Sequence, residues 1–387
     1  MKKFYGLVCV FYLLFYHTFA DSIPDKPKTF YFSGYLNELY IPAYYFGINH
    51  FNNTGIIHNR MNFKYIPTKN WELAAECRTR FIFQDFRNYS KEMFKTMTQD
   101  AGWLNLGWNI VTSPYFVLTT SVERLYVGYQ TDKWSIKIGR QRINWSQALF
   151  FNPNDIFNGY SFFDYDYPEL QGSDAIRLSA YPTSTSAVEM AAKLNYHGKL
   201  TMAGIYRFNT NNWDIQLLGG LVNTEDLMLG IGFSSDIKSV NLRGEFSYYY
   251  SLLSNADIKN TYVATIGADY IFSNSIMLSV SVLYNRMPKN YKSNLETLLS
   301  VPASPKYLSI TEWTVIGQIS YPFSPIVNGG IAALCFVNLP AFYVGPNIEW
   351  SITDALTLSA MIQDFIGTKK MQPTNLLIGY LRLKWNF

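Results

Sequence analysis

The sequence predicts an all-β chain: an antiparallel up-and-down barrel that crosses a membrane with its strands. Three observations predict it. First, segments of about ten residues alternate apolar and polar side chains along most of the chain, which is the pattern of a transmembrane β-barrel. Second, the chain is 17% aromatic but only 16% charged, whereas a soluble domain is roughly a quarter charged. Third, the last segment alternates in the same way and ends on an aromatic residue, Phe387.

Residues 1–20 have the three-part pattern of a secretory signal peptide. Lys2 and Lys3 form the basic start, an uncharged apolar stretch follows, and small residues close it. A single membrane anchor is the alternative, but the stretch is short and no cluster of charges follows it. Cys9 lies inside the apolar stretch and not at its end, which argues against a lipid anchor. We therefore expect a signal peptide followed by one barrel domain, residues 21–387.

The alternation divides each segment into two faces. A Lys or Arg that faces lipid at the bilayer midplane costs roughly 2–4 kcal/mol, so the charged face must be the lumen. The C-terminal segment shows this best, because Leu377, Gly379, Leu381, Leu383, Trp385 and Phe387 alternate with Tyr380, Arg382, Lys384 and Asn386. The same pattern occurs at residues 57–65, 71–83, 240–248 and 342–352. Aromatic residues at segment ends are expected to form the interface girdles.

The number of strands follows from counting and parity. Roughly nineteen segments fit the pattern, but bacterial single-chain barrels have an even number of strands. The segment to drop is residues 101–110, because treating it as part of the first long loop keeps the later long connections at one end of the barrel. We predict about 18 strands, with about 16 as the alternative, and either barrel is wide enough for an aqueous channel.

The connections between segments have two lengths. Short ones predict periplasmic turns, at residues 131–133, 209–212, 234–239, 273–275 and 353–354. Long ones predict extracellular loops, at residues 84–114, 143–172, 251–260 and 285–309. A soluble β-sandwich or propeller is the alternative fold, but no propeller repeat of roughly 40–50 residues is present. A soluble fold also leaves the signal peptide and the terminal aromatic residue unexplained.

One region carries a more specific motif. It reads GRQR at residues 139–142, NPNDIFN at 152–158, DYPE at 166–169 and GSDAIRL at 172–178. With these motifs the chain resembles outer-membrane porin-like families that include the alginate-export channels, although Ser146 stands where those families have Gly. The resemblance implies a passive pore in the outer membrane of a Gram-negative bacterium, with residues 143–172 folding inward to line a constriction. A final strand that ends in Phe likewise resembles the signal read by the barrel-assembly machinery.

The predicted site is therefore a charged constriction and lumen wall. The constriction residues are Arg140, Arg142, Arg124, Arg177, Asp155, Asp164, Asp166 and Glu169, and the wall residues are Arg60, Arg78, Arg80, Arg207, Arg243 and Arg382. Rings of Arg and Lys select anions in pores. The alternative is a ladder of ion pairs with lumen carboxylates on neighbouring strands. For Arg140 and Arg142 a second alternative is that they brace the inward loop through Asp155, Asp164 or Asp166.

Several classes of function are not indicated. The chain has no G-x-S-x-G elbow, no H-E-x-x-H and no Gly-rich phosphate loop, so we expect no enzyme. The acidic residues between 164 and 174 lack the ordered spacing of a calcium loop, and we expect neither metal nor cofactor. The net charge of +4 without a basic block argues against nucleic acid as a partner. Cys77 and Cys335 lie among apolar neighbours, and we expect no disulfide between them.

The sequence thus predicts a channel in the outer membrane for passive diffusion of small hydrophilic solutes, with anionic or sugar-like solutes favoured. The membrane lipid and the transported solutes are the expected partners, and the oligomeric state is left open. If the loops plug the lumen, the alternative is a non-transporting surface barrel that acts as an adhesin or structural envelope protein.

Overall fold

The computed structural model describes residues 29–84, 98–158, 172–289, 304–337, 339, 341–367 and 375–387. The expected signal peptide and three of the predicted constriction residues, Asp164, Asp166 and Glu169, lie outside the described residues. The described regular structure is β except for one short 3-10 helix, Phe46–Ile48. No helix in this part of the chain is long and apolar enough to cross a membrane.

The strands follow one another along the chain with few interruptions. They are β1 (Phe30–Tyr45), β2 (His50–Thr68), β3 (Trp71–Gln84), β4 (Gly107–Thr112), β5 (Phe116–Gln130), β6 (Trp134–Gln141), β7 (Ser173–Thr183), β8 (Ser186–Leu194), β9 (Leu200–Thr210), β10 (Trp213–Val222), β11 (Asp226–Ile237), β12 (Val240–Ser251), β13 (Asn260–Ile271), β14 (Met277–Asn285), β15 (Trp313–Ser324), β16 (Val327–Phe336), β17 (Ala341–Ser351), β18 (Leu356–Ile366) and β19 (Asn375–Asn386).

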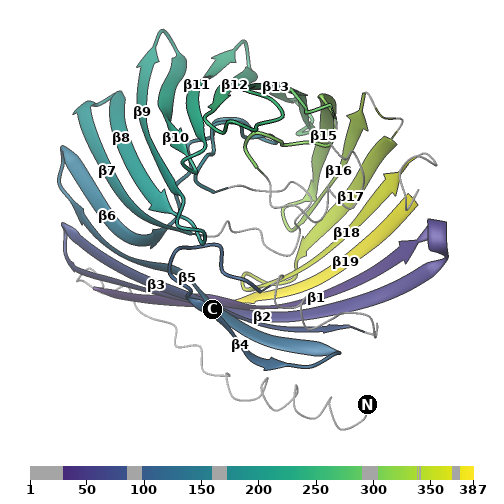
Figure 1. Cartoon of the computed structure of the whole chain (residues 1–387). Helices are drawn as coiled ribbons and strands as arrows, with labels where there is room; N and C mark the ends of the chain where they lie inside the picture. The colour runs from purple at the N-terminus through teal and green to yellow at the C-terminus, as the bar shows by residue number, and fades with distance from the viewer. Residues whose placement is uncertain are drawn as a thin grey trace.

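The strands pair antiparallel with their neighbours, and the pairing of β1 with β19 closes them into a ring (Figure 1). One strand stands apart from this order. Among the described strands β4 pairs only with β5, which also pairs with β3 and β6. The ring therefore contains 18 strands, as the sequence predicted. Leaving the segment at residues 101–110 out of the strand count is also confirmed, because β4 lies in the connection between β3 and β5 and adds no strand to the ring.

The seam of the ring lies between the first and the last strand. The register runs from Tyr35 opposite Asn386 to Tyr45 opposite Leu376. Beyond it, the Gly34 amide donates to the Phe387 carbonyl at 2.8 Å, and the Phe387 amide donates back at 2.9 Å. The terminal residue is thus part of the closing ladder, and no backbone edge is left open at the seam.

The two faces of each strand meet different surroundings. On β11, Leu229 is 65% exposed on the outer face, while its neighbour Met228 is 1% exposed inside. Because side chains alternate across a strand, this pattern gives the barrel an apolar outer surface and a more polar inner one. The lumen-facing set includes fully buried polar residues such as Gln216, Ser247 and Thr261.

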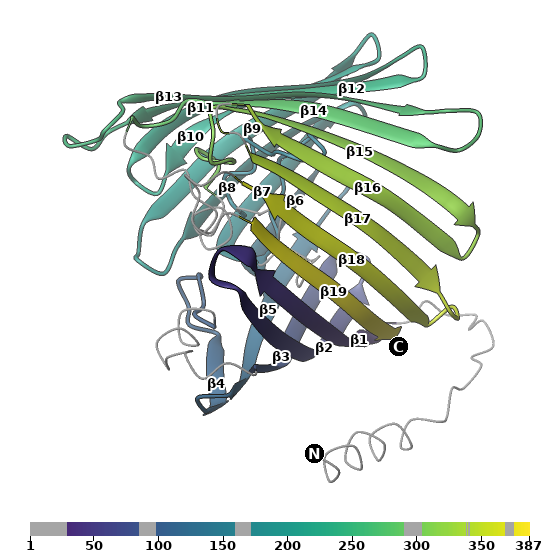
Figure 2. The ribbon, with the colours of Figure 1, turned by 90° about the vertical axis from the view of Figure 1, so that its right-hand side faces the viewer.

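The two ends of the barrel differ in their connections (Figure 2). At the end that carries the C-terminus, which we call the turn end, strands join through tight turns. Two of these, at Asn211–Asn212 and Lys238–Ser239, have both residues at positive φ, the geometry that matches the twist of a hairpin. The opposite end, the loop end, carries the long connections of β3–β5, β6–β7 and β14–β15. Not every connection at the loop end is long, since β8–β9 and β10–β11 also turn tightly.

Candidate functional site

The chain leaves the wall after β6 and packs against the inside of the barrel before β7 begins. We call its described part, residues 142–158, the inward segment. Ile143, Trp145 and Phe157 are almost completely buried, and the last two rings meet edge to face with centroids 4.8 Å apart. They belong to one apolar cluster with lumen-facing wall residues such as Ala191 and Met228. Burial of this apolar surface holds the segment against the wall.

Glu245, which faces the lumen on β12, is the first polar anchor of the inward segment. One carboxylate oxygen accepts hydrogen bonds from the Ser146 hydroxyl at 2.9 Å, the Ala148 amide at 2.8 Å and the Gln147 amide. The other oxygen accepts one from the Asn154 amide at 3.0 Å. Hydrogen bonds to an ionised acceptor are roughly twice as strong as neutral ones. Four such donors therefore offset the cost of burying this carboxylate and fix both sides of the segment's turn.

Glu189 on β8 is the second anchor. Its Oε1 accepts a hydrogen bond from the indole N–H of Trp145. Its Oε2 accepts from the Arg177 guanidinium at 2.5 Å and from the Ser179 hydroxyl at 3.2 Å, and Arg207 lies 3.9 Å away. One buried carboxylate thus joins the inward segment to two arginines of the lumen wall.

The turn between these anchors is held by the wall as well. The Tyr249 hydroxyl donates to the Pro153 carbonyl at 3.1 Å, and the Ser247 hydroxyl donates to Oδ1 of Asn154 at 2.9 Å. The side-chain amide of Asn154 in turn donates to the Ile231 carbonyl at 3.2 Å. The Asn-Pro turn that the sequence indicates is therefore seated on β11 and β12.

Asp155 is a buried carboxyl within this turn, 3% exposed. No hydrogen bond of ordinary geometry reaches either of its oxygens in the described part of the chain. Burial raises the pKa of Asp155 from 3.8 to about 7, while the Asn158 amide, Arg142 and Lys193 act in the opposite direction and Glu245 adds to the increase. Asp155 therefore changes its charge near neutral pH.

The remaining lumen charges lie mostly in ion pairs. Two carboxylates each serve two cations: Glu189, as described, and Glu72, which lies 2.9 Å from Lys64 and 3.2 Å from Lys137. Further pairs inside the barrel join Arg60 with Glu76, Arg78 with Glu123 and Arg243 with Asp269. At Glu72 and at Glu189, therefore, two cations lie beside one carboxylate.

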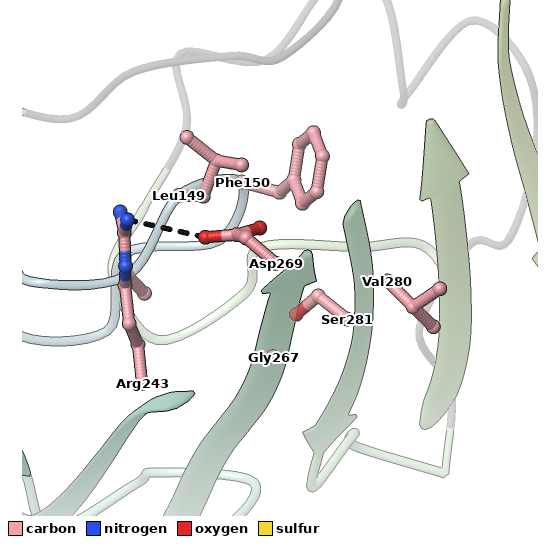
Figure 3. A pocket seen from close by; sticks show the side chains of 8 residues that line it. Leu149, Phe150, Arg243, Gly267, Asp269, Val280 and Ser281 are labelled. Carbon is pink, nitrogen blue, oxygen red and sulfur yellow. Dashed lines mark ion pairs between the residues drawn. The ribbon is translucent and has the colours of Figure 1, made fainter. Parts of the chain in front are cut away.

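A small pocket lies between the inward segment and the wall (Figure 3). Arg243 and Asp269 form its charged side, with guanidinium and carboxylate 3.1 Å apart. Leu149 and Phe150 of the inward segment form the apolar side, and Ser281 of β14 also lines it. A solute at this depth would meet a charged pair on the wall and apolar side chains on the segment.

The structure separates the predicted site residues into groups. Arg142 is exposed in the inward segment and has no ion pair within the described residues. Arg177 and Arg207 are partly exposed to the lumen, next to the Glu189 anchor. The others face inward but are partly or fully covered: Arg60, Arg78, Arg80, Arg124, Arg243 and Arg382. Of the predicted carboxylates, only Asp155 lies within the described residues.

The prediction that Arg140 lines the constriction is wrong, because its side chain does not face the lumen. It lies on the same face of β6 as Ile138, which is 52% exposed on the outside of the barrel. Directly across the ladder from it is Asp174 on β7, which shares that outward face. The two side chains form a bidentate pair with distances of 2.7 and 2.9 Å.

All five donors of the Arg140 guanidinium are used. Besides the two bonds to Asp174, Nη1 donates to Asp100 at 2.6 Å and to the Val122 carbonyl at 3.0 Å, and Nη2 donates to the Leu104 carbonyl at 2.7 Å. Arg140 therefore braces the first long loop against β5 and β7, and not the inward segment through Asp155 as one interpretation expected. Among the described residues no group of three or more His, Cys, Asp or Glu side chains is placed to hold a metal ion.

The sequence did not reveal that Glu189 and Glu245 hold the inward segment. The alternation of side chains places both carboxylates on the lumen side, but no pattern in the neighbouring residues shows that Trp145 contacts Glu189 or that Ser146 contacts Glu245. Their separations along the chain, 44 residues for Trp145 and Glu189 and 99 for Ser146 and Glu245, explain why.

Comparisons with known proteins place the fold. No protein-family model matches the sequence, and no curated protein sequence matches it. Solved structures do match. OccAB2 of Acinetobacter baumannii superposes with a TM-score of 0.62 at 8% identity, over 92% of this chain and 98% of that one. OccK11 (OpdR) of Pseudomonas aeruginosa has a TM-score of 0.60 at 7% identity, over 92% and 96%. OprD of the same organism has a TM-score of 0.59 at 7% identity, over 92% and 95%.

The chain has the fold of the OprD and Occ outer-membrane porins. This confirms the porin-like part of the resemblance drawn from the sequence motifs, at the level of the fold. At such low identity it is the architecture that is shared: a closed antiparallel barrel of 18 strands.

Proposed function

We propose that this protein is a channel, and not an enzyme, that lets small hydrophilic solutes diffuse passively across the outer membrane of a Gram-negative bacterium. The observation that carries the proposal is the closed 18-strand ring with charged side chains inside and apolar ones outside. A barrel of this strand number is wide enough for water and small solutes. The inward segment then acts as the constriction, because it reduces the open cross-section at the depth of Glu189 and Glu245.

Two charged sites in the lumen, Glu72 and Glu189, support a preference for anions. Glu72 and Glu189 each balance two cations, so these sites keep a positive excess. Exposed Arg142 adds another cation in the inward segment. Cations that line a pore favour anions within it. We therefore propose carboxylated or phosphorylated small molecules, including acidic sugars, as the preferred solutes.

One observation favours the second candidate, a surface barrel that does not transport. The apolar cluster of the inward segment continues through Ile310 of the β14–β15 connection to Leu334, Tyr343 and Leu376, which face the lumen from β16, β17 and β19. Apolar contact across the interior narrows the barrel toward its loop end. If this apolar contact closes the lumen completely, the protein does not transport, and its loops would then serve to bind partners at the cell surface.

Single-channel recording in planar bilayers separates the two candidates. We expect the refolded protein to give discrete open currents, with a reversal potential in a salt gradient that shows anion preference. A correctly folded barrel that gives no current at any voltage would support the surface protein instead. Open currents with cation preference would keep the channel and overturn the anion part.

The finer likeness to alginate-export channels rests on the motifs at residues 139–142, 152–158 and 172–178. It is tested by adding alginate oligomers or neutral malto-oligosaccharides of matched length to the bilayer chamber. We expect the acidic oligomers to block the current at lower concentration. Equal block by both sugars would remove the acidic-sugar proposal without affecting the channel.

We also propose that the barrel-assembly machinery reads the last strand through Phe387. Its ring packs against Phe32 and Trp385, with centroids 5.8 and 5.3 Å away. Deletion of Phe387 should lower the amount of folded barrel in the outer membrane, while refolding in detergent should proceed. A defect of equal size in both would indicate a role in the seam alone.

A further inference from the structure

The described strands of the ring are paired on both sides, but β4 has a partner on one side only. Its pairing with β5 contains an irregularity between Asn109 and Val111. β4 therefore has a free backbone edge in the part of the chain that the structure describes.

Two hydrogen bonds fix which backbone groups face that edge. The Val122 amide donates to the Leu106 carbonyl at 2.9 Å, and the Ser113 amide donates to the Phe116 carbonyl at 2.8 Å. In an antiparallel pair the residues that exchange hydrogen bonds alternate with those that do not.

Counting from these two bonds, the backbone groups of Trp108 and Val111 face β5. Those of Asn109 and Thr112 face the free edge.

The side chains around this edge are apolar and exposed. The set that we call the hairpin patch consists of residues that are 44–57% exposed: Trp103, Leu104, Trp108, Ile110, Val111 and Tyr115. β4 itself, Gly107–Thr112, contains neither a charged residue nor a proline. Natural proteins usually protect edge strands with charges, proline or a cover, because an open edge pairs with other chains. β4 has neither the charged residues nor the proline that would protect its edge.

The position of β4 makes the free edge accessible. Figure 2 shows β4 at the loop end, outside the wall and running across the barrel axis. The apolar side chains around it are 44–57% exposed, so the edge lies within an apolar part of the outer surface. An unpaired backbone group in such an apolar place costs several kcal/mol.

The geometry points to β4 of a second copy of this chain as the occupant of that edge. Two copies in one membrane have the same orientation and are related by an axis along the membrane normal. Strands that run across this axis become antiparallel in such a pair, which is the arrangement that an edge-to-edge ladder needs. The contact is then self-complementary, as in other two-fold dimers. An uncharged edge also suits an identical uncharged edge better than a charged partner.

Cysteine cross-linking in the membrane tests this pairing. Cys77 and Cys335 are free thiols, so both are first replaced by Ser. Asn109→Cys is then compared with Leu229→Cys, which is exposed to lipid on β11. We expect mild oxidation to give a covalent dimer for Asn109→Cys and none for Leu229→Cys. Equal cross-linking of the two variants, or none at Asn109, would overturn the proposal.

The oligomeric state in detergent gives an independent measurement. Asn109→Pro removes an N–H that faces the free edge and leaves the bonds to β5 intact. We expect light scattering to show a dimer for the unaltered protein and a monomer for Asn109→Pro. A second variant, Ile110→Lys, should have the same effect through charge repulsion and covers the case in which the proline variant misfolds. The proposal would be overturned if the unaltered protein were monomeric. It would also be overturned if the unaltered protein carried a different protein and not a second copy of itself.

Discussion

Trp145 donates its indole N–H to the carboxylate of Glu189, and the same carboxylate holds Arg177. One side chain, Glu189, therefore links the position of the inward segment to the charge of the lumen wall. A change on either side of this contact reaches the other, because the carboxylate has only two oxygens to share.

Replacement of Trp145 by Phe isolates this contact. The smaller ring keeps most of the packing against Phe157, but the N–H donor is lost. Removing one partner of a buried polar group costs about 1–3 kcal/mol. We expect a folded barrel whose single-channel current fluctuates more in the open state. Trp134→Phe, at an exposed tryptophan of the turn end, is the control, and equal noise in both variants would contradict the anchor.

Glu245→Gln tests the other anchor. The amide loses the charge that four donors of the inward segment bind, and its own N–H groups now face some of those donors. We expect the segment to loosen and the mean conductance to rise. Glu349→Gln is the matched control, since Glu349 is an exposed carboxylate on the lumen side of β17, opposite Ser359. A conductance that stays at the unaltered value for Glu245→Gln would show that the segment does not set the aperture.

The raised pKa of Asp155 predicts that the stability of the folded barrel depends on pH. Its pKa is raised from 3.8 to about 7 in the folded chain, so between these values the folded state binds the proton more tightly than the unfolded state does. Stability should therefore fall as pH rises through this window, by up to ~1.4 kcal/mol per pH unit, and level off above pH ~7. Urea unfolding at pH 5 and pH 8 measures the difference. Asp155→Asn should remove most of it, and an unchanged pH dependence in that variant would assign the effect to another group.

Arg140→Ala should affect stability more than transport. It leaves Asp100 and Asp174 buried without their cation, and breaking a buried pair in this way costs about 3–5 kcal/mol. We expect a lower urea midpoint and faster proteolysis in the first long loop. Ion selectivity should stay the same, because Arg140 lies on the outer face of β6. If the variant has normal stability but a large shift of the reversal potential, Arg140 lines the lumen after all.

Arg207→Gln should weaken the anion preference. Arg207 is the more distant of the two cations that share Glu189, so its removal leaves one cation for one carboxylate. We expect the reversal potential to move toward the non-selective value while the open conductance changes little. Arg286→Gln, whose guanidinium donates to the Asn260 carbonyl at the loop end, provides a control of equal charge change. The same shift in both variants would mean that net charge, and not this site, sets the selectivity.

Much of the barrel could be predicted because its signal is local. The alternation of Leu229 with Met228, or of Ile138 with Lys137, follows from the period of a strand and needs no partner. The tight turns at Asn211–Asn212 and Lys238–Ser239 are likewise local, since their φ angles suit short hairpins. The count of 18 strands needed only this pattern and the rule of even parity.

The candidate site was less predictable, because its contacts join distant parts of the chain. Arg140 was assigned to the lumen from its place in a charged motif. The face that a strand residue occupies depends on register, and a shift of one residue exchanges lumen and outside. Only the ladder that sets Arg140 opposite Asp174, on the same face as exposed Ile138, decides the question.

By itself, then, the sequence determined the strand period, the closed barrel, the strand number and the loop that lies between β6 and β7. The tertiary structure alone decided which carboxylates hold the inward segment, which side of the wall Arg140 faces and which strand has a free edge. The physical reason is that periodicity acts between neighbouring residues, whereas Glu189, Glu245 and Asp100 take their roles from side chains that reach them only once the ring has closed.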